Sequence, residues 1–319
     1  MSASRSVLIL LLGALVLSCG ARTGLEQPEV VDTVGQRPVI TFVVNVGTGT
    51  DRFSDGGRRL EDIAIDAVRQ ALVTIGDRAT VSFAPTPPYT RTGTCATVGS
   101  IDFGPSASVG AAMMRRLEAE RAFGGGRGPA NVDGTLRFAA ETLVRRGTPG
   151  DQGFLVLVDT GGGSCTAAGR GATETIATLR RDPGYRVLVL GVHTGNAIND
   201  HQFTQFLDRY APAGGLAETP PSPFSWIGAE DIPRMRRRLQ RDILRSWWCV
   251  RRPAEPVVDA PCLQLRGSDG RAVPRDDAGT NGWRWRGGVT DTLEINGPAC
   301  DGLATDGIET RLVRAHCGS

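Results

Sequence analysis

Residues 38–51 have the sequence PVITFVVNVGTGTD, and this stretch decides the fold. Residues 39–46 form an almost unbroken apolar, β-branched run that gives way abruptly to Gly and Thr. Such a run predicts a strand that is buried on both faces and ends in a tight loop. The segment RRLEDIAIDAVRQALVTIG at 58–76 then predicts an amphipathic helix. A strand, a small-residue loop and a helix open a doubly wound α/β domain, whose ligand crevice lies at the carboxyl ends of the strands.

The same alternation continues over residues 38–248. Apolar strand-like runs recur at 79–84, 154–158 and 186–192, and weaker patterns indicate a short strand at 96–103 and an edge strand from Leu216. Helical patterns fall between and after them, at 106–123, 136–143, 174–181, 202–210 and 230–248. This order predicts a mostly parallel sheet covered by helices on both faces.

The character of the chain changes after residue 248. Residues 249–319 hold four cysteines, many Gly and Pro, and short strand-like runs at 292–296 and 310–314. At about 70 residues, a core alone gives marginal stability, so disulfides are expected to support it. We therefore predict a small Cys-rich, β-rich C-terminal module.

The N-terminus has the pattern of an export signal. Arg5 precedes an apolar run at 7–17 that is too short to span a bilayer. The following VLSCG at 16–20 resembles a bacterial lipobox, in which the cysteine, here Cys19, becomes the lipidated first residue. Residues 1–19 are thus expected to be a lipoprotein signal and residues 20–37 a flexible tether. An ordinary secretory signal cleaved near Cys19 is the alternative. Because Gly20 is not Asp, the outer membrane is the expected destination.

Six cysteines remain in the mature chain, and an even number in an exported protein suggests three disulfides. Sequence does not choose among the pairings, although short loop closures favour Cys249–Cys262 and Cys300–Cys317, which leaves Cys95–Cys165. A zinc site is not expected, because no CxxC occurs and the three histidines are scattered.

Three segments resemble the von Willebrand factor A (vWA) family over residues 38–248. They are FVVNVGTGT at 42–50, GGGRGPANVDGTLRFAAETL at 124–143 and FLVLVDTGGG at 154–163. In that family the first strand ends in Asp-x-Ser-x-Ser, a middle loop gives Thr and a later strand ends in Asp. The resemblance implies a divalent-ion site whose open position takes an acidic residue of the ligand. The cysteine-rich tail also resembles the tail of a group of bacterial A-domain lipoproteins.

The ion site is degenerate in this chain. Asn45 stands at the first Asp, Gly47 and Gly49 at the two Ser, and Ala130 at the Thr, and only Asp159 matches. Mg²⁺ needs several oxygen ligands in near-octahedral geometry, and glycine supplies no side-chain oxygen. A one-residue shift would offer other oxygens, so the candidate positions are Asn45, Thr48, Thr50, Asp133 and Asp159. The alternative is that Asn45 and Asp159 bond loop backbone groups, as Asn and Asp commonly do.

Other chemistry finds little support. No G-x-S-x-G, P-loop or G-x-G-x-x-G follows a strand. Cys165 lies beside glycines as a thiol nucleophile could, but a disulfide partner is favoured in an exported chain, and His193 is a lone loop histidine. The formal net charge of +2 gives no indication of nucleic-acid binding. We therefore expect a protein that is not an enzyme.

The helix at 230–248 is rich in arginine. Its apolar residues repeat at helical spacing and predict a core stripe of Met235, Leu239, Ile243 and Trp247. The arginines are expected to form a solvated face, or alternatively a surface for anionic lipid phosphates; they are Arg234, Arg236, Arg237, Arg238, Arg241 and Arg245.

Together these patterns predict a membrane-anchored envelope lipoprotein. Its vWA-like domain would bind an envelope or extracellular protein without a metal cofactor. The alternatives are a divalent-ion-dependent adhesin that uses the shifted ligands with Mg²⁺, and an envelope hydrolase.

Overall fold

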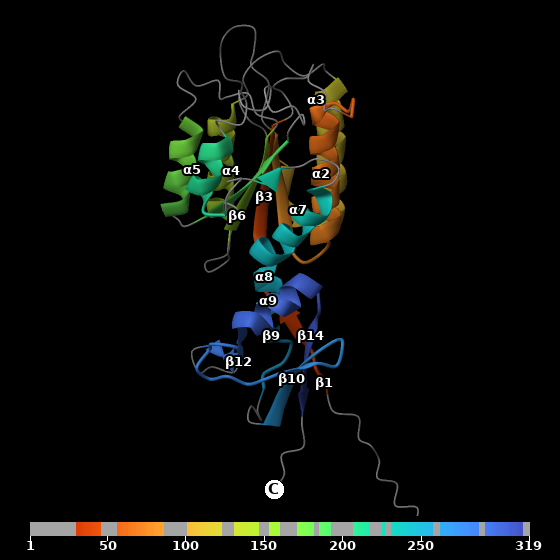
Figure 1. The fold of residues 1–319 in the computed structure, drawn as a ribbon, viewed down its shortest axis with the longest axis vertical. Helices are drawn as coiled ribbons and strands as arrows, with labels where there is room; N and C mark the ends of the chain where they lie inside the picture. The colour runs from red at the N-terminus through yellow and green to blue at the C-terminus, as the bar shows by residue number, and fades with distance from the viewer. Residues whose placement is uncertain are drawn as a thin grey trace, which may run out of the picture.

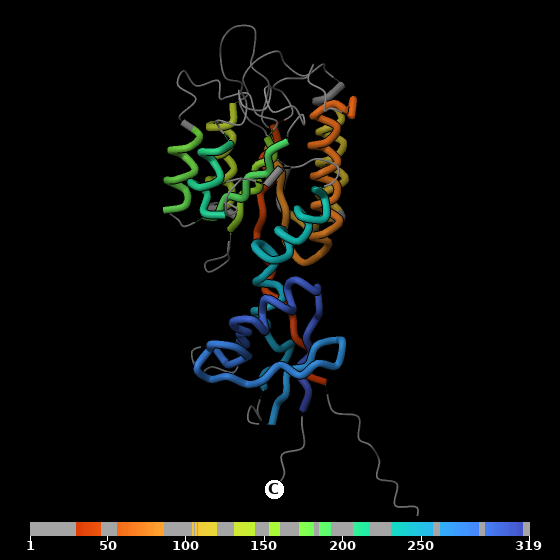
Figure 2. Tube along the Cα trace, viewed as in Figure 1, coloured from red at the N-terminus to blue at the C-terminus, as the bar shows by residue number. Residues whose placement is uncertain are grey.

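The computed structural model places two lobes one above the other along the long axis of the molecule (Figures 1 and 2). It describes residues 30–45, 56–85, 101–122, 131–146, 153–159, 171–181, 185–192, 207–216, 225–226, 231–257, 262–286 and 291–314. The larger lobe holds the predicted α/β domain. The smaller lobe lies at the opposite end and contains most of the chain after Cys249.

A six-stranded sheet forms the centre of the larger lobe, in the order β5-β4-β3-β6-β7-β8. Neighbouring strands are parallel except for β5 at one edge, which is antiparallel to β4. Every residue of β3 and β6 is buried, as the apolar runs predicted. The strands are β3 (Val39–Asn45), β4 (Thr80–Pro85), β5 (Ile101–Pro105), β6 (Gly153–Asp159), β7 (Arg186–Gly191) and β8 (Ser225–Trp226).

Helices cover both faces of this sheet, so the predicted doubly wound architecture is confirmed (Figure 1). One face carries α2 (Leu60–Ile75), α3 (Ser106–Ala122) and α7 (Ile232–Arg238). The other carries α4 (Val132–Arg146), α5 (Gly171–Arg181) and a helical segment at 207–214. The helix expected to stop at residue 210 thus continues through Pro212. The side chains form two separate apolar clusters, one on each side of the sheet.

The arginine-rich helix is not uniform. The expected single helix at 230–248 divides into α7, the π-helical turn η2 (Leu239–Ile243) and α8 (Arg245–Cys249). Its predicted apolar stripe is confirmed, since Met235, Leu239, Ile243 and Trp247 are all buried. The wider π turn lets one helical stretch pack first against α2 and then against α9 (Gly297–Asp306) of the smaller lobe.

Two antiparallel sheets build the smaller lobe, and each includes a strand from the N-terminal side of the chain. The sheet orders are β1-β14-β10-β11 and β12-β13-β9-β2. The strands are β1 (Val30–Val31), β2 (Thr33–Gly35), β9 (Val250–Pro253), β10 (Leu263–Gly267), β11 (Ala272–Val273), β12 (Gly282–Trp285), β13 (Leu293–Asn296) and β14 (Thr310–Arg314).

Strands β1 and β2 correct the expected tether over 20–37. Val30 and Val31 pair with β14, and residues 33–35 pair with β9, so this part of the segment is ordered in the smaller lobe. The strands were missed because each is only two or three residues long, too short to show an alternating pattern. The lobe is therefore assembled from residues on both sides of the α/β domain.

Arg251 joins the lobes at this point. Its side chain is 4% exposed, and Nη2 donates to the carbonyl oxygen of Thr33 at 2.8 Å while Nη1 donates to that of Trp247 at 3.2 Å. The guanidinium also lies 5.8 Å from the Trp247 ring centroid. Burial lowers the pKa of Arg251. Gly35 is required here, because a Cβ would lie 2.4 Å from the carbonyl oxygen of Trp247.

The disulfide pairing differs from the one that short closures favoured. Cys249 at the end of α8 bonds Cys300 in α9, with the Cα atoms 5.4 Å apart. The expected pairs Cys249–Cys262 and Cys300–Cys317 are therefore wrong. Sequence proximity failed because α9 returns to α8 after 51 residues. Cys262 is also disulfide-bonded, and Cys95, Cys165 and Cys317 lie outside the described residues.

The two ends of the described chain lie together, far from the carboxyl edge of the central sheet. Val30 in β1 is paired with Val313 in β14. Strand β3 begins four residues after β2 and runs away from the smaller lobe, so the carboxyl ends of the parallel strands lie at the opposite pole (Figure 1). Among the described residues, no helix has the length and apolar character needed to cross a membrane.

Candidate functional site

The carboxyl edge of the sheet brings together two residues that the sequence singled out. Strands β3 and β6 are parallel neighbours whose register places Asn45 opposite Asp159. Asn45 Nδ2 donates a hydrogen bond to Asp159 Oδ1 at 2.8 Å. Asn45 is fully buried and Asp159 is 2% exposed. The contact between these side chains was not anticipated, since loop backbone groups were the expected partners. This hydrogen bond occupies one oxygen of the Asp159 carboxylate, the group that would bind a metal ion in the vWA pattern.

Asp133 also lies near this edge, in the first turn of α4. Its carboxylate is buried and accepts hydrogen bonds from the hydroxyl of Thr175 in α5 and from Nε of Arg137, the latter at 3.3 Å. A negative charge in the first turn of a helix is favoured by the helix dipole. Asn131 Oδ1 accepts from the backbone N–H of Gly134 at 2.9 Å and so fixes the start of the same helix.

Tyr210 connects the two carboxylates electrostatically. Its side chain is 1% exposed, and its hydroxyl has no hydrogen-bond partner among the described residues. Burial raises the pKa of Tyr210, and the negative charges of Asp159 and Asp133 raise it further. Both carboxylates therefore lie close enough to the Tyr210 hydroxyl to act on it electrostatically. We call Asn45, Asp133, Asp159, Thr175 and Tyr210 the edge cluster.

The edge cluster has two members that the sequence did not reveal. Thr175 and Tyr210 belong to helical segments whose patterns were recognised, but their polar atoms turn inward. The only available indication was the position of Tyr210 on a helix with an apolar pattern. A hydroxyl on such a face needs a buried polar neighbour.

The described part of the cluster fits a divalent ion poorly. No group of three or more His, Cys, Asp and Glu side chains among the described residues could hold a metal ion. Asn45 replaces a carboxylate with a neutral amide and donates to Asp159, so the pair offers a cation one negative charge where the vWA pattern offers two. The remaining candidate positions, Gly47, Thr48, Gly49, Thr50 and Ala130, lie outside the described residues.

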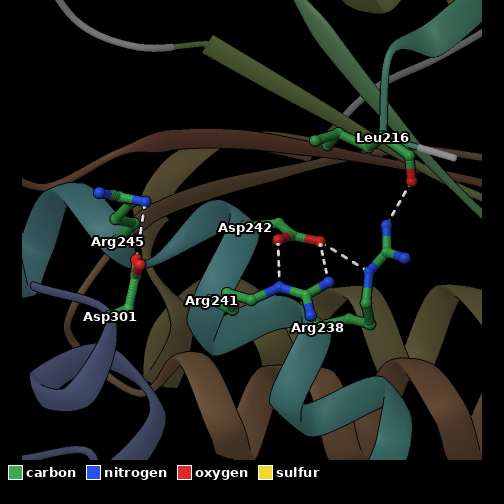
Figure 3. Close-up of polar contacts among 6 residues, drawn as sticks. All are labelled: Leu216, Arg238, Arg241, Asp242, Arg245 and Asp301. Atoms are coloured by element: carbon green, nitrogen blue, oxygen red, sulfur yellow. Dashed lines mark hydrogen bonds and ion pairs between the residues drawn. The ribbon is translucent and has the colours of Figure 1, made fainter. Parts of the chain in front are cut away.

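A second concentration of charge lies on the divided helix (Figure 3). Asp242 forms ion pairs with both Arg238 and Arg241: Arg238 Nε lies 2.6 Å from Oδ2, and Arg241 Nε lies 2.7 Å from Oδ1. Arg238 also donates to the carbonyl oxygen of Leu216. Arg245 reaches across to Asp301 in α9 at 2.8 Å.

The expected solvated arginine face is therefore wrong for Arg238, which is 5% exposed. Burial lowers the pKa of Arg238, and the charge of Asp242 opposes that shift. Periodicity misplaced this residue because the π turn η2 begins directly after it and rotates the helix face. Arg236 and Arg237 are exposed, as expected.

Comparison with known proteins gives similarity at the level of structure. No protein-family model matches the chain, and no curated protein sequence matches it. The pilus adhesin SpaC from Lactobacillus rhamnosus GG, in its open conformation, is 14% identical with a TM-score of 0.50. The match covers 88% of this chain and 39% of SpaC, so the chain spans about two fifths of the adhesin's length.

Two further structures are similar at lower TM-scores. A von Willebrand factor type A protein from Catenulispora acidiphila is 13% identical with a TM-score of 0.43, covering 92% of this chain and 67% of its own. The manganese-loaded TRAP protein of Plasmodium vivax is 13% identical with a TM-score of 0.42, covering 65% of this chain and 76% of its own. Identities this low concern the fold alone. The mixed α/β fold, with its parallel central sheet, is consistent with a vWA-like domain.

Proposed function

We propose that this chain is a lipid-anchored envelope protein whose vWA-like lobe binds another protein at the carboxyl edge of its sheet, without a metal ion and without enzymatic activity. The observation that carries the proposal is the Asn45–Asp159 hydrogen bond, in which a neutral amide occupies one oxygen of the only carboxylate that matches the vWA ion-site pattern. The partner would be an envelope or extracellular protein.

The arrangement of the two lobes supports this orientation. The described chain starts at Val30 in the smaller lobe, so an anchor at Cys19 would lie on that side. The carboxyl edge lies at the other pole and would face away from the membrane (Figure 1). The ordered strands β1 and β2 shorten the tether to the residues between Cys19 and Val30, which limits how far the domain can reach from the bilayer.

Fractionation tests the anchor. In Cys19→Ala the attachment thiol is gone, so we expect the protein to leave the membrane fraction or to keep an uncleaved signal. Ser18→Ala changes the neighbouring residue to a small one and serves as the control that should still be processed. A Cys19→Ala protein that is processed and sediments with membranes like the parent would refute the lipid anchor, and with it the outer-membrane location.

Site-specific crosslinking tests the binding edge. Arg58 is exposed just before α2, at the carboxyl edge, whereas Val34 in β2 is 51% exposed at the other pole. A photo-crosslinking residue at position 58 should capture a discrete envelope protein in cells, and the same residue at 34 should not. Capture of the same protein from both positions, or from 34 alone, would contradict binding at the edge.

The divalent-ion-dependent adhesin is favoured by one observation, the convergence of Asp133 and Asp159 on Tyr210. Thermal unfolding separates it from the metal-free proposal. An ion at 100 times its dissociation constant adds about 2.7 kcal/mol of stability. We expect equal melting temperatures in EDTA and in millimolar Mg²⁺, Mn²⁺ or Ca²⁺. An ion-dependent rise that Asp159→Ala abolishes would establish the adhesin.

A further inference from the structure

The segment 30–35, which contains β1 and β2, carries an exposed row of side chains on the smaller lobe. Val30, Asp32 and Val34 are exposed, whereas the residues between them are half-buried or buried. Val30 is 46% exposed and Val34 is 51% exposed. They are two of the three large apolar side chains exposed in the described part of the chain, and the third, Val73, lies on α2 of the larger lobe. Their position on one row of one segment distinguishes them from singly scattered apolar residues.

Strand β14 lies beside this row. Val30 is in register with Val313. A 3.4 Å hydrogen bond from the Thr33 hydroxyl to the carbonyl oxygen at position 310 continues that register, which places Asp32 beside Arg311. Arg311 is exposed and Val313 is half-buried. Two adjacent cross-strand pairs, one apolar and one charged, therefore lie on the same outward surface. We call these four residues, Val30, Asp32, Arg311 and Val313, the β1–β14 face.

The charged pair of this face does not close on itself. Asp32 and Arg311 are exposed, and neither side chain makes an ion pair or a hydrogen bond among the described residues. Exposed Arg252, Arg266 and Glu309 lie around them, on β9, on β10 and just before β14. The face thus offers one carboxylate and one guanidinium side by side, next to an apolar pair and inside a polar rim.

We propose that the β1–β14 face binds a second copy of this chain about a two-fold axis that runs along the strands, between β1 and β14. Rotation about that axis exchanges the positions of the two strands. Each Val30 then meets Val313 of the second copy, and each Asp32 meets Arg311 of the second copy. A two-fold contact requires this reciprocity, since the same patch serves on both subunits. The opposite charges that stay apart within one chain become partners between two chains.

The direction of the axis suits two copies at one membrane. The chain runs from Val30 towards the larger lobe along the long axis of the molecule (Figures 1 and 2). A two-fold axis along the strands therefore keeps both carboxyl edges at one pole and both N-terminal sides at the other. The contact involves few side chains, so we expect a weak dimer, which anchoring in a shared membrane would favour through effective concentration. The contact itself depends neither on the anchor nor on protein binding at the carboxyl edge.

Sedimentation equilibrium of the purified, unlipidated mature chain tests the proposal at concentrations up to about 1 mM. We expect a monomer–dimer equilibrium. Asp32→Arg and Arg311→Asp should each weaken the dimer by about tenfold or more, because each substitution creates two like-charge contacts across the axis. The double variant with both substitutions exchanges the charges and should recover dimerisation. Arg236→Asp makes the same charge change as Arg311→Asp on the exposed face of α7 and should leave the equilibrium unchanged.

Thiol crosslinking locates the contact. With a short bismaleimide, Val30→Cys should give a crosslinked dimer, whereas Val73→Cys, an equally exposed substitution on α2, should match the background of the parent chain. Protection of the Val30→Cys thiol by phosphatidylglycerol vesicles, without a crosslink between copies, would identify a lipid surface as the occupant and overturn the dimer. The proposal also fails if the chain stays monomeric, if the double charge exchange does not recover dimerisation, or if the two cysteine variants crosslink alike.

The photo-crosslinking experiment at position 34 remains interpretable beside this contact. A product from position 34 that contains only this chain reports the two-fold contact, and its mass is twice that of the chain. It carries no information on a partner protein at the carboxyl edge.

Discussion

The carboxylates at the two poles of the central sheet have different kinds of partner. At the carboxyl edge, Asp159 accepts from the neutral amide of Asn45, and Asp133 accepts from the Thr175 hydroxyl and from Arg137. Hydrogen bonds within the larger lobe thus satisfy these carboxylates from neighbouring strands and helices. At the junction with the smaller lobe, guanidiniums supply the donors, since Arg238 and Arg241 pair with Asp242 and Arg245 pairs with Asp301. A charged pair instead joins the divided helix to the smaller lobe, between Arg245 and Asp301 of α9.

The disulfide gives the strongest test of the junction. Cys249→Ala with Cys300→Ala opens a crosslink that spans 51 residues. On the chain-entropy estimate this lowers the free energy of unfolding by about 4 kcal/mol. Urea denaturation of the double variant measures the loss. Because the crosslink joins α8 to α9, near-ultraviolet circular dichroism of the nearby tryptophans should change first.

Peptide mapping of the unreduced parent provides the control for that experiment. It should yield a Cys249–Cys300 crosslinked peptide, and thiol titration of the denatured, unreduced mature chain should find no free thiol. Two or more reactive thiols would contradict complete pairing of the six cysteines. Loss of less than about 1 kcal/mol in the double variant would show that packing alone holds α8 against α9.

Arg251 should have the next largest effect. Arg251→Met keeps much of the apolar stem but leaves the carbonyl oxygens of Thr33 and Trp247 without their charged donor. Because these bonds are buried and involve a charged group, we expect a loss of about 3 kcal/mol. Arg252→Met, at the exposed neighbouring position, should change the free energy of unfolding by less than about 0.5 kcal/mol. Equal effects of the two substitutions would contradict the conclusion that Arg251 joins the two lobes.

At the opposite pole, Asn45→Asp should convert the closed edge cluster into one that repels itself. The substitution faces the carboxylate of Asp159 with a second carboxylate in a buried site. One of the pair must then hold a proton, so its pKa in the folded state rises above the unfolded value. We expect a loss of about 2 kcal/mol at pH 7, which shrinks as the pH falls toward 4 because the unfolded state then also binds that proton.

Two further variants serve as controls for Asn45→Asp. Asn45→Ala removes the amide without adding charge, so its loss of stability should depend on pH less steeply than that of Asn45→Asp over the same range. Asn45→Asp combined with Gly47→Ser, Gly49→Ser and Ala130→Thr restores the vWA pattern and should gain Mg²⁺-dependent stability that the parent lacks. If the parent gains equally from Mg²⁺, the edge is already an ion site and the comparison between the poles is wrong.

Long buried strands and amphipathic helices were predictable from the sequence, because each carries its own periodic pattern. The runs that became β3 and β6 are buried at every residue, and the apolar stripe from Met235 to Trp247 packs in the core. Strand β2 could not be predicted, since three residues show no period and their pairing with β9 joins positions more than two hundred residues apart. The Cys249–Cys300 bond could not be predicted for the same reason, because the distance between two cysteines along the sequence does not show which helices pack together.

Three of the five residues of the edge cluster could be identified from the sequence. Asn45, Asp133 and Asp159 follow from comparison with the vWA pattern, because strand ends and helix starts are where that pattern has its functional residues. Thr175 and Tyr210 depend on which way a helix face turns after folding. Arg238 was misassigned on similar grounds, since a π turn changes the face that α-helical spacing predicts.

Substitution of Tyr210 should have the smallest effect on the free energy of unfolding, and its dependence on pH makes it the most specific. Its hydroxyl is buried and has no hydrogen-bond partner in the described part of the chain, so Tyr210→Phe should keep or raise the free energy of unfolding by up to about 1 kcal/mol. Because the pKa of Tyr210 is raised in the folded state, its protonated form contributes stability that is complete below the unfolded pKa near 10 and is lost as the pH rises above it. Tyr210→Phe should therefore flatten the decline in stability above pH 10, measured by urea denaturation from pH 8 to 11. Tyr185→Phe is the matched control, because burial alone raises the pKa of Tyr185. A loss of more than 1 kcal/mol in Tyr210→Phe at pH 7 would mean that the hydroxyl has a stabilising partner. The set of hydrogen bonds assigned to the edge cluster would then lack the one made by Tyr210.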